Sequence, residues 1–131
     1  MKLTKERAIA EHRKMWLWIS RQIMKDYLAN RTVREIYSYK CDYLNKVYPN
    51  EIISYKCFCC EYVKQSGIDC YKDCPLYWND KCTERTCCEH FGYYSIINRI
   101  SIMCHNFCTF KEVKKMAIMA YKIAMLEEKE Q

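Results

Sequence analysis

The residues best suited to chemistry lie between Lys56 and His90, a stretch that holds eight cysteines and one histidine. Cys57 and Cys60 have the C-x2-C spacing, which presents two thiolates to one zinc ion because backbone N–H groups of the turn point at the sulfurs. Cys70 and Cys74 form a second pair, nine residues further along the chain, so the chain has room to double back and close a site. This spacing predicts one structural zinc ion per chain.

The predicted zinc ligands are Cys57, Cys60, Cys70 and Cys74, with Cys82 in reserve if the C-x3-C pair supplies only one sulfur. Cys59, between the first two, is expected to be a neighbour of the site and not a ligand. A second site built from Cys82, Cys87, Cys88 and His90 is disfavoured, because adjacent cysteines rarely both bind one ion. The alternative to the zinc site is a set of small buried thiols without metal.

A four-thiolate site leaves no open coordination position, which argues against zinc-dependent hydrolysis. The sequence also lacks the H-E-x-x-H and G-x-S-x-G motifs, and its two glycines are too few for a phosphate-binding loop. A cysteine nucleophile with His90 or His105 as base is conceivable, but no spacing selects one thiol among eleven. We therefore expect a protein that is not an enzyme.

The first residues are charged, with no apolar segment typical of a signal peptide, and the longest strongly apolar run, Met15 to Ile19, is too short to span a bilayer. We therefore expect a cytoplasmic protein that does not insert into membranes. In a reducing compartment, closely spaced cysteines favour metal binding over disulfides.

The net charge of +6 is concentrated in residues 1–56, which carry twelve Lys/Arg and six Asp/Glu. Four cations recur on one side of the first expected helix: Arg7, Lys14, Arg21 and Lys25. Such a row suits an acidic protein surface or nucleic acid, and it is also common on plain solvated helix faces. Residues 57–108 carry five Lys/Arg and six Asp/Glu, so the cysteine-rich segment is not itself a basic DNA-reading module.

Aromatic residues crowd around the cysteines, and Tyr77 and Trp78 are the best candidates for a protein contact. Tyrosine and tryptophan on a rigid loop are typical of protein–protein hot spots. Their alternative role is to cover the metal site.

With only two glycines and two prolines, the chain favours helices joined by short connections. The first helix is expected from Lys5 to Ala29 with Thr4 as its N-cap. His12 lies on its apolar stripe, which predicts a core histidine; the alternative is a contact with the zinc site. A Thr32–Glu35 capping box predicts a second helix that ends before Pro49.

The run from Glu51 to Tyr55 is β-prone and predicts one strand of a small zinc ribbon. After the cysteines, Tyr93 to Phe107 repeats apolar residues at steps of three and four, and Thr109 with Glu112 forms a capping box for a closing helix. Cys41 and Cys104 are expected to be packing residues on or beside helix faces.

These patterns predict a mainly α fold of about four helices with an inserted zinc-knuckle or ribbon segment. The chain is expected to be one domain over residues 1–131, with N-terminal helices in 1–48, the cysteine-rich segment in 49–92 and C-terminal helices in 93–131.

Three short motifs and the closing helix, KEVKKMAIMAYKIAMLEEK from Lys111, resemble those of small cysteine-rich proteins encoded by phages and prophages of low-GC Gram-positive bacteria. The matching residues are His12 and Trp16; Cys57, Cys60, Glu61 and Tyr62; and Cys74, Pro75 and Trp78. Cys70 departs from the pattern, because three residues and not two separate it from Cys74.

This resemblance implies a phage accessory protein in the cytoplasm of a bacterial host. Small phage accessory proteins often act against host defence, and they include anti-CRISPR inhibitors of Cas9-type nucleases. A chain of net charge +6 cannot mimic DNA, so such an inhibitor would use protein contacts to block DNA loading or activation. The alternative is a phage nucleic-acid-binding or transcription-regulating zinc protein.

Overall fold

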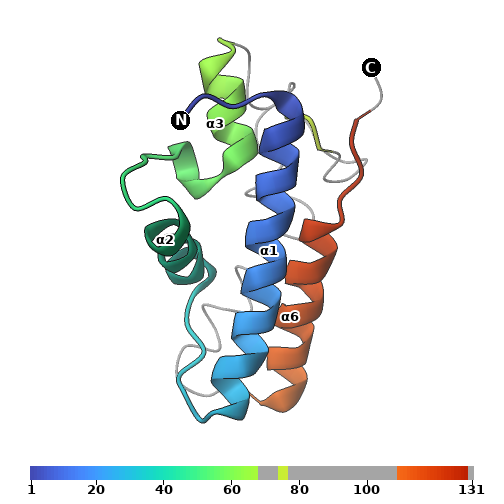
Figure 1. Ribbon diagram of the computed structural model, residues 1–131. Helices are drawn as coiled ribbons and strands as arrows, with labels where there is room; N and C mark the ends of the chain where they lie inside the picture. Colours follow the sequence, from blue (N-terminus) through green and yellow to red (C-terminus); the bar gives the residue numbers. More distant parts are fainter. Residues whose placement is uncertain (68–73, 77–108, 130–131) are drawn as a thin grey trace.

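The computed structural model describes residues 1–67, 74–76 and 109–129, and helix dominates these ranges (Figure 1). They contain α1 (Lys5–Leu28), α2 (Ile36–Val47), a short 3-10 helix η1 (Ser54–Lys56), α3 (Phe58–Gln65) and α6 (Phe110–Ala124). Within the described residues the only β pairing is an isolated bridge between Leu76 and Glu128. The predicted mainly α architecture is confirmed.

The central element is α1, which contacts α2, α3 and α6. Its start matches the sequence prediction, because the Thr4 side chain accepts a hydrogen bond from the N–H of Arg7. The side chains that α1 buries follow a helical repeat: Ala8, Ile9, Glu11, His12, Met15, Trp16, Ile19, Ile23 and Asp26. Burial of this stripe against its neighbours stabilises the helix far more than its intrinsic propensity does.

Helix α6 lies antiparallel beside α1 (Figure 1). The predicted capping box is present: the Thr109 side chain accepts from the N–H of Glu112, and the Glu112 carboxylate accepts from the N–H of Thr109. The predicted inner face is also confirmed, since Val113, Met116, Ala117, Ala120, Ile123 and Ala124 are all buried. Ser20 of α1 donates to the carbonyl of Ala117 at 2.7 Å, so a polar contact accompanies the apolar packing.

The prediction of a capping box at Thr32 and Glu35 is wrong, because α2 begins only at Ile36 and has no side-chain cap. Hydrogen bonds to side chains of the adjoining helices hold the preceding loop away from helical geometry. Arg31 donates to Asp26 at 2.9 Å, and the N–H of Arg34 donates to the hydroxyl of Tyr39 at 3.2 Å. These bonds to buried partners outweigh a local cap.

The predicted strand at Glu51–Tyr55 is also wrong, since η1 begins inside it at Ser54. The Glu61 carboxylate accepts hydrogen bonds from both the N–H and the hydroxyl of Ser54, which fixes a turn where a strand would continue straight. Lys56, at a φ of 51°, then redirects the chain into Cys57.

Several sequence predictions lie outside the described residues: the Tyr93–Phe107 helix, Cys104, Tyr77 and Trp78. No helix in the described ranges combines the length and apolar content needed to cross a membrane.

Candidate metal centre

Cys57 is the N-cap residue of α3, and its Sγ accepts a hydrogen bond from the backbone N–H of Cys60 at 3.4 Å. The first predicted pair is therefore placed as a C-x2-C metal knuckle requires, with a sulfur at a helix N-terminus and a backbone N–H directed at it. Both the cap and the helix dipole favour a thiolate over a thiol at Cys57.

A hydrogen bond from the Cys60 thiol lowers the pKa of Cys57 to about 6, with further help from the charge of Lys40 and from the N–H groups of Cys60 and Cys59, although burial opposes the shift. Lys40, from α2, is itself only 4% exposed. Its ammonium lies 5.8 Å from the ring centroid of Trp16, an arrangement that stabilises a desolvated cation. Helix α2 thus places a buried positive charge near Cys57, whose thiol ionises more readily than an ordinary cysteine.

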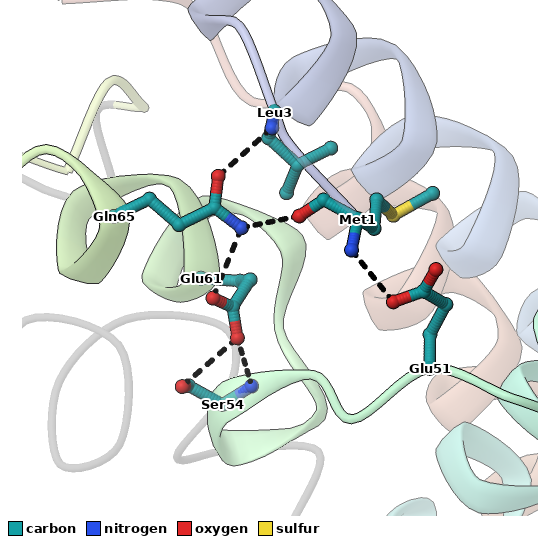
Figure 2. A network of polar contacts seen from close by, with 6 residues as sticks. All are labelled: Met1, Leu3, Glu51, Ser54, Glu61 and Gln65. Atoms are coloured by element: carbon teal, nitrogen blue, oxygen red, sulfur yellow. Dashed lines mark hydrogen bonds and ion pairs between the residues drawn. The ribbon is translucent and has the colours of Figure 1, made fainter.

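A polar network fastens α3 to the N-terminal segment (Figure 2). The Gln65 side chain accepts from the N–H of Leu3 at 2.9 Å and donates to the carbonyl of Met1 and to Glu61. Glu61 in turn holds Ser54, three residues before Cys57. Burial alone would raise the pKa of Glu61, but these hydrogen bonds lower it overall, so Glu61 acts as a charged anchor that fixes the entry to the knuckle.

Cys74 reaches the same region through the C-terminal tail. The N–H of Lys129 donates to the carbonyl of Pro75 at 2.9 Å, and Leu76 pairs with Glu128. The tail is held to α1 because Arg13 donates to the carbonyl of Leu126 at 3.1 Å. Residues 74–76 consequently lie near the N-terminal end of α1 (Figure 1).

Cys74 forms a hydrogen bond there with Cys59, which the sequence predicts only as a neighbour of the site. Both thiols are buried, and their hydrogen bond, followed by burial, raises the pKa of Cys59. Helical spacing could have revealed the burial of Cys59. In a helix over Phe58–Gln65, Cys59 and Val63 are four residues apart and share the inner face. Cys59 is therefore a protonated packing thiol in this arrangement.

The described residues thus hold one knuckle pair, Cys57 with Cys60, and a second thiol pair, Cys59 with Cys74. Within residues 1–67, 74–76 and 109–129, no three His, Cys, Asp or Glu side chains are grouped so that they could hold a metal ion. The remaining candidates lie outside these ranges: Cys70, Cys82, Cys87, Cys88 and His90. The chemistry of the Cys57–Cys60 pair suits zinc, and a four-ligand site would need ligands beyond the described residues.

The prediction that His12 is a core histidine is confirmed. It is 1% exposed, and its Nε2 lies 2.9 Å from the carbonyl oxygen of Ile123. Because a carbonyl only accepts, Nε2 carries the proton. Burial lowers the pKa of His12 to about 4, with smaller contributions from the charges of Lys40 and Arg13 and opposition from the Ile123 bond, so the ring is neutral at physiological pH.

The predicted row of cations on α1 is exposed at all four positions, Arg7, Lys14, Arg21 and Lys25. Lys14 has an ion pair with Glu11 at 3.6 Å, which leaves most of its side chain in solvent. The other predicted packing cysteine, Cys41, is half-buried on α2, beside the hydroxyl of Tyr37.

Comparison with known proteins gives no assignment: no protein-family model, curated protein or solved structure matches the chain. Function must therefore be inferred from the site itself and from the short motifs in the sequence. Of those motifs, His12 and Trp16 lie in the core of α1, and Cys57, Cys60 and Glu61 build and anchor the start of α3.

Proposed function

We propose that this chain is a non-enzymatic binding protein stabilised by one structural zinc ion, and that it inhibits a host defence nuclease of the Cas9 type through protein–protein contact. The observation that carries the metal half of this proposal is the Cys57–Cys60 pair. A thiolate at the N-terminus of α3, with a backbone N–H donated to its sulfur, is a ready ligand for a thiophilic cation.

Cys57 and Cys60 would hold two of the four zinc positions, and Cys70, Cys74 and Cys82 are the candidates for the others. If Cys74 is a ligand, it must exchange its contact with Cys59 for a metal bond. A fully thiolate-bound zinc ion would cross-link the start of α3 to the cysteine-rich segment, and its binding free energy would add to the folding free energy.

The partner half of the proposal is supported by the cation row of α1. Arg7, Lys14, Arg21 and Lys25 are exposed on the side of the helix away from its buried stripe, so a large rigid helix presents four positive charges without disturbing the core. Such a row attracts an acidic protein patch and accelerates association. Tyr77 and Trp78 would supply the desolvated part of the contact.

The same four cations favour a second candidate, a nucleic-acid-binding or regulatory zinc protein. The salt dependence of binding distinguishes the two candidates. Phosphate binding weakens steeply as the salt concentration rises, whereas an interface centred on aromatic residues weakens much less.

The decisive experiment combines elemental analysis with gel filtration. We expect about one zinc per chain, co-elution with a Cas9-type nuclease and little binding to duplex DNA at physiological salt. Metal-free protein with protected disulfides would contradict the zinc proposal. Tight, salt-sensitive binding of duplex DNA by the isolated protein, without nuclease binding, would contradict the inhibitor proposal and favour the regulator.

A further inference from the structure

The outward side of α6 carries large apolar side chains that remain about half exposed, although the Phe110 ring also contacts Tyr27 of α1. The exposed fractions are 50% for Phe110, 43% for Ile118, 51% for Tyr121 and 45% for Met125. Ile118, Tyr121 and Met125 are spaced by three and four residues and so lie along one line of the helix. Four large apolar groups on one side of a single helix exceed the scattered exposure that needs no explanation.

Lysines follow this apolar line along the same helix. Lys111, Lys115 and Lys122 are exposed on one flank of the line, and Lys114 is exposed within it. The only carboxylate in α6 belongs to Glu112, and that side chain is used in the capping box with Thr109. We call these eight residues, the four apolar side chains and the four lysines, the α6 outer face.

We propose that the α6 outer face docks an acidic amphipathic helix of a partner protein. Such a helix laid alongside α6 would cover Ile118, Tyr121 and Met125 with its own apolar stripe and set its carboxylates against the flanking lysines. Helix-against-helix recognition uses anchors at this three-and-four spacing, and the opposite charges would fix orientation and increase the association rate.

The arrangement of the two kinds of side chain distinguishes this partner from others. A nucleic acid would use the lysines and leave Ile118 and Met125 in water. A flat anionic membrane favours an apolar stripe with cations on both flanks, whereas here the other flank is formed by the buried residues Val113, Ala117 and Ala124. An antiparallel pairing of α6 with that of a second copy would bring lysines against lysines. This inference goes beyond the proposed function and stands without it.

The test measures binding of the full chain to a fluorescent acidic amphipathic peptide, a helical sequence with leucines at three-and-four spacing flanked by glutamates. The comparison probes are the same peptide with lysines in place of glutamates, duplex DNA, and vesicles of phosphatidylglycerol and phosphatidylcholine. We expect the acidic peptide to bind most tightly. Its affinity should fall about tenfold or more in Lys111→Glu/Lys115→Glu and in Ile118→Ser/Tyr121→Ser.

Lys64→Glu is the matched control, because Lys64 is an exposed lysine on α3, and it should leave peptide affinity within about twofold of wild type. Circular dichroism confirms that each variant is folded. Failure to bind the acidic peptide, tighter binding to DNA or vesicles, dimerisation through this face, or equal losses in Lys64→Glu would each overturn the proposal.

Discussion

The Nε2 of His12 lies 2.9 Å from the carbonyl oxygen of Ile123, and this bond joins the middle of α1 to the last turn of α6. Carbonyls in the last turn of a helix lack partners within that helix. Arg13 binds the carbonyl of Leu126 just beyond. His12 and Arg13, which are adjacent in α1, thus bind carbonyl groups at and just beyond the C-terminal end of α6. From there the chain continues into the tail that pairs with the Cys74 segment.

Protonation of His12 should destabilise the protein at mildly acidic pH. Its pKa in the folded protein is lowered to about 4, while the unfolded value is about 6.5, so between these values the unfolded state binds more protons. The stability contributed by the neutral ring is therefore complete above pH 6.5 and is lost as pH falls toward 4. From pH 7 to pH 5 this group should cost about 2 kcal/mol.

The check is urea denaturation of wild type and His12→Gln over this pH range. Glutamine retains a donor for the Ile123 carbonyl but does not titrate, so the variant should lose less stability than wild type between pH 7 and pH 5. Parallel curves would show that His12 is not the titrating group.

The buried position of His12 on α1 is one of the features that the sequence could predict. Apolar residues at steps of three and four, together with caps at Thr4 and Thr109, located α1 and α6 correctly, because long helices with one buried face depend on local pattern. The start of α2 and the turn at Ser54 were mispredicted, because side chains of the adjoining helices, Asp26 near the end of α1 and Glu61 in α3, hold those loops through hydrogen bonds that no capping or strand pattern encodes.

The cysteines combine one local contact with one between distant parts of the chain. Spacing was enough to predict a backbone N–H of Cys60 directed at the sulfur of Cys57, but the helix α3 that begins at Phe58 was not predicted. The Cys59–Cys74 contact depends on the C-terminal tail pairing with Pro75 and Leu76. No spacing rule relates residues 74–76 to residues 128 and 129.

Asp26 should be a strong determinant of stability. It is 5% exposed and accepts hydrogen bonds from Gln22, Arg31 and Tyr39 at 2.8 to 2.9 Å. Asp26→Ala would leave the buried Tyr39 hydroxyl and the Arg31 guanidinium without this acceptor and should cost about 3 kcal/mol. Chemical denaturation measures the loss.

Asp42→Ala is the control for Asp26→Ala, because Asp42 forms an ion pair with Arg34 in which both side chains are exposed by more than a third. Exposed pairs contribute about 0–1 kcal/mol. Equal losses in the two variants would contradict a structural role for the buried carboxylate.

Cys60→Ser should lower the melting temperature sharply if the Cys57–Cys60 pair binds zinc, because loss of the metal also removes its contribution to folding. Zinc content, measured on the same sample, should fall in parallel. Cys41→Ala is the matched cysteine control: Cys41 is half-buried on α2, so its variant should retain zinc and lose no more than about 1 kcal/mol. A Cys60→Ser variant with unchanged zinc content and unchanged melting would refute this ligand assignment.

The cation row of α1 can be tested separately from the aromatic candidates near the cysteines. Reversing Arg7, Lys14, Arg21 and Lys25 to Glu changes long-range attraction while leaving the buried stripe of α1 intact. Under the proposed inhibitor function, association with a Cas9-type nuclease should therefore slow by about tenfold or more at low salt, with a smaller change in dissociation. Tyr77→Ala or Trp78→Ala should instead accelerate dissociation, because truncating a desolvated anchor acts on the formed complex.

Surface plasmon resonance at two salt concentrations separates the effect on the association rate from the effect on the dissociation rate. If the charge reversal leaves the association rate unchanged at both, the row is a solvated helix face and the partner contacts must lie elsewhere.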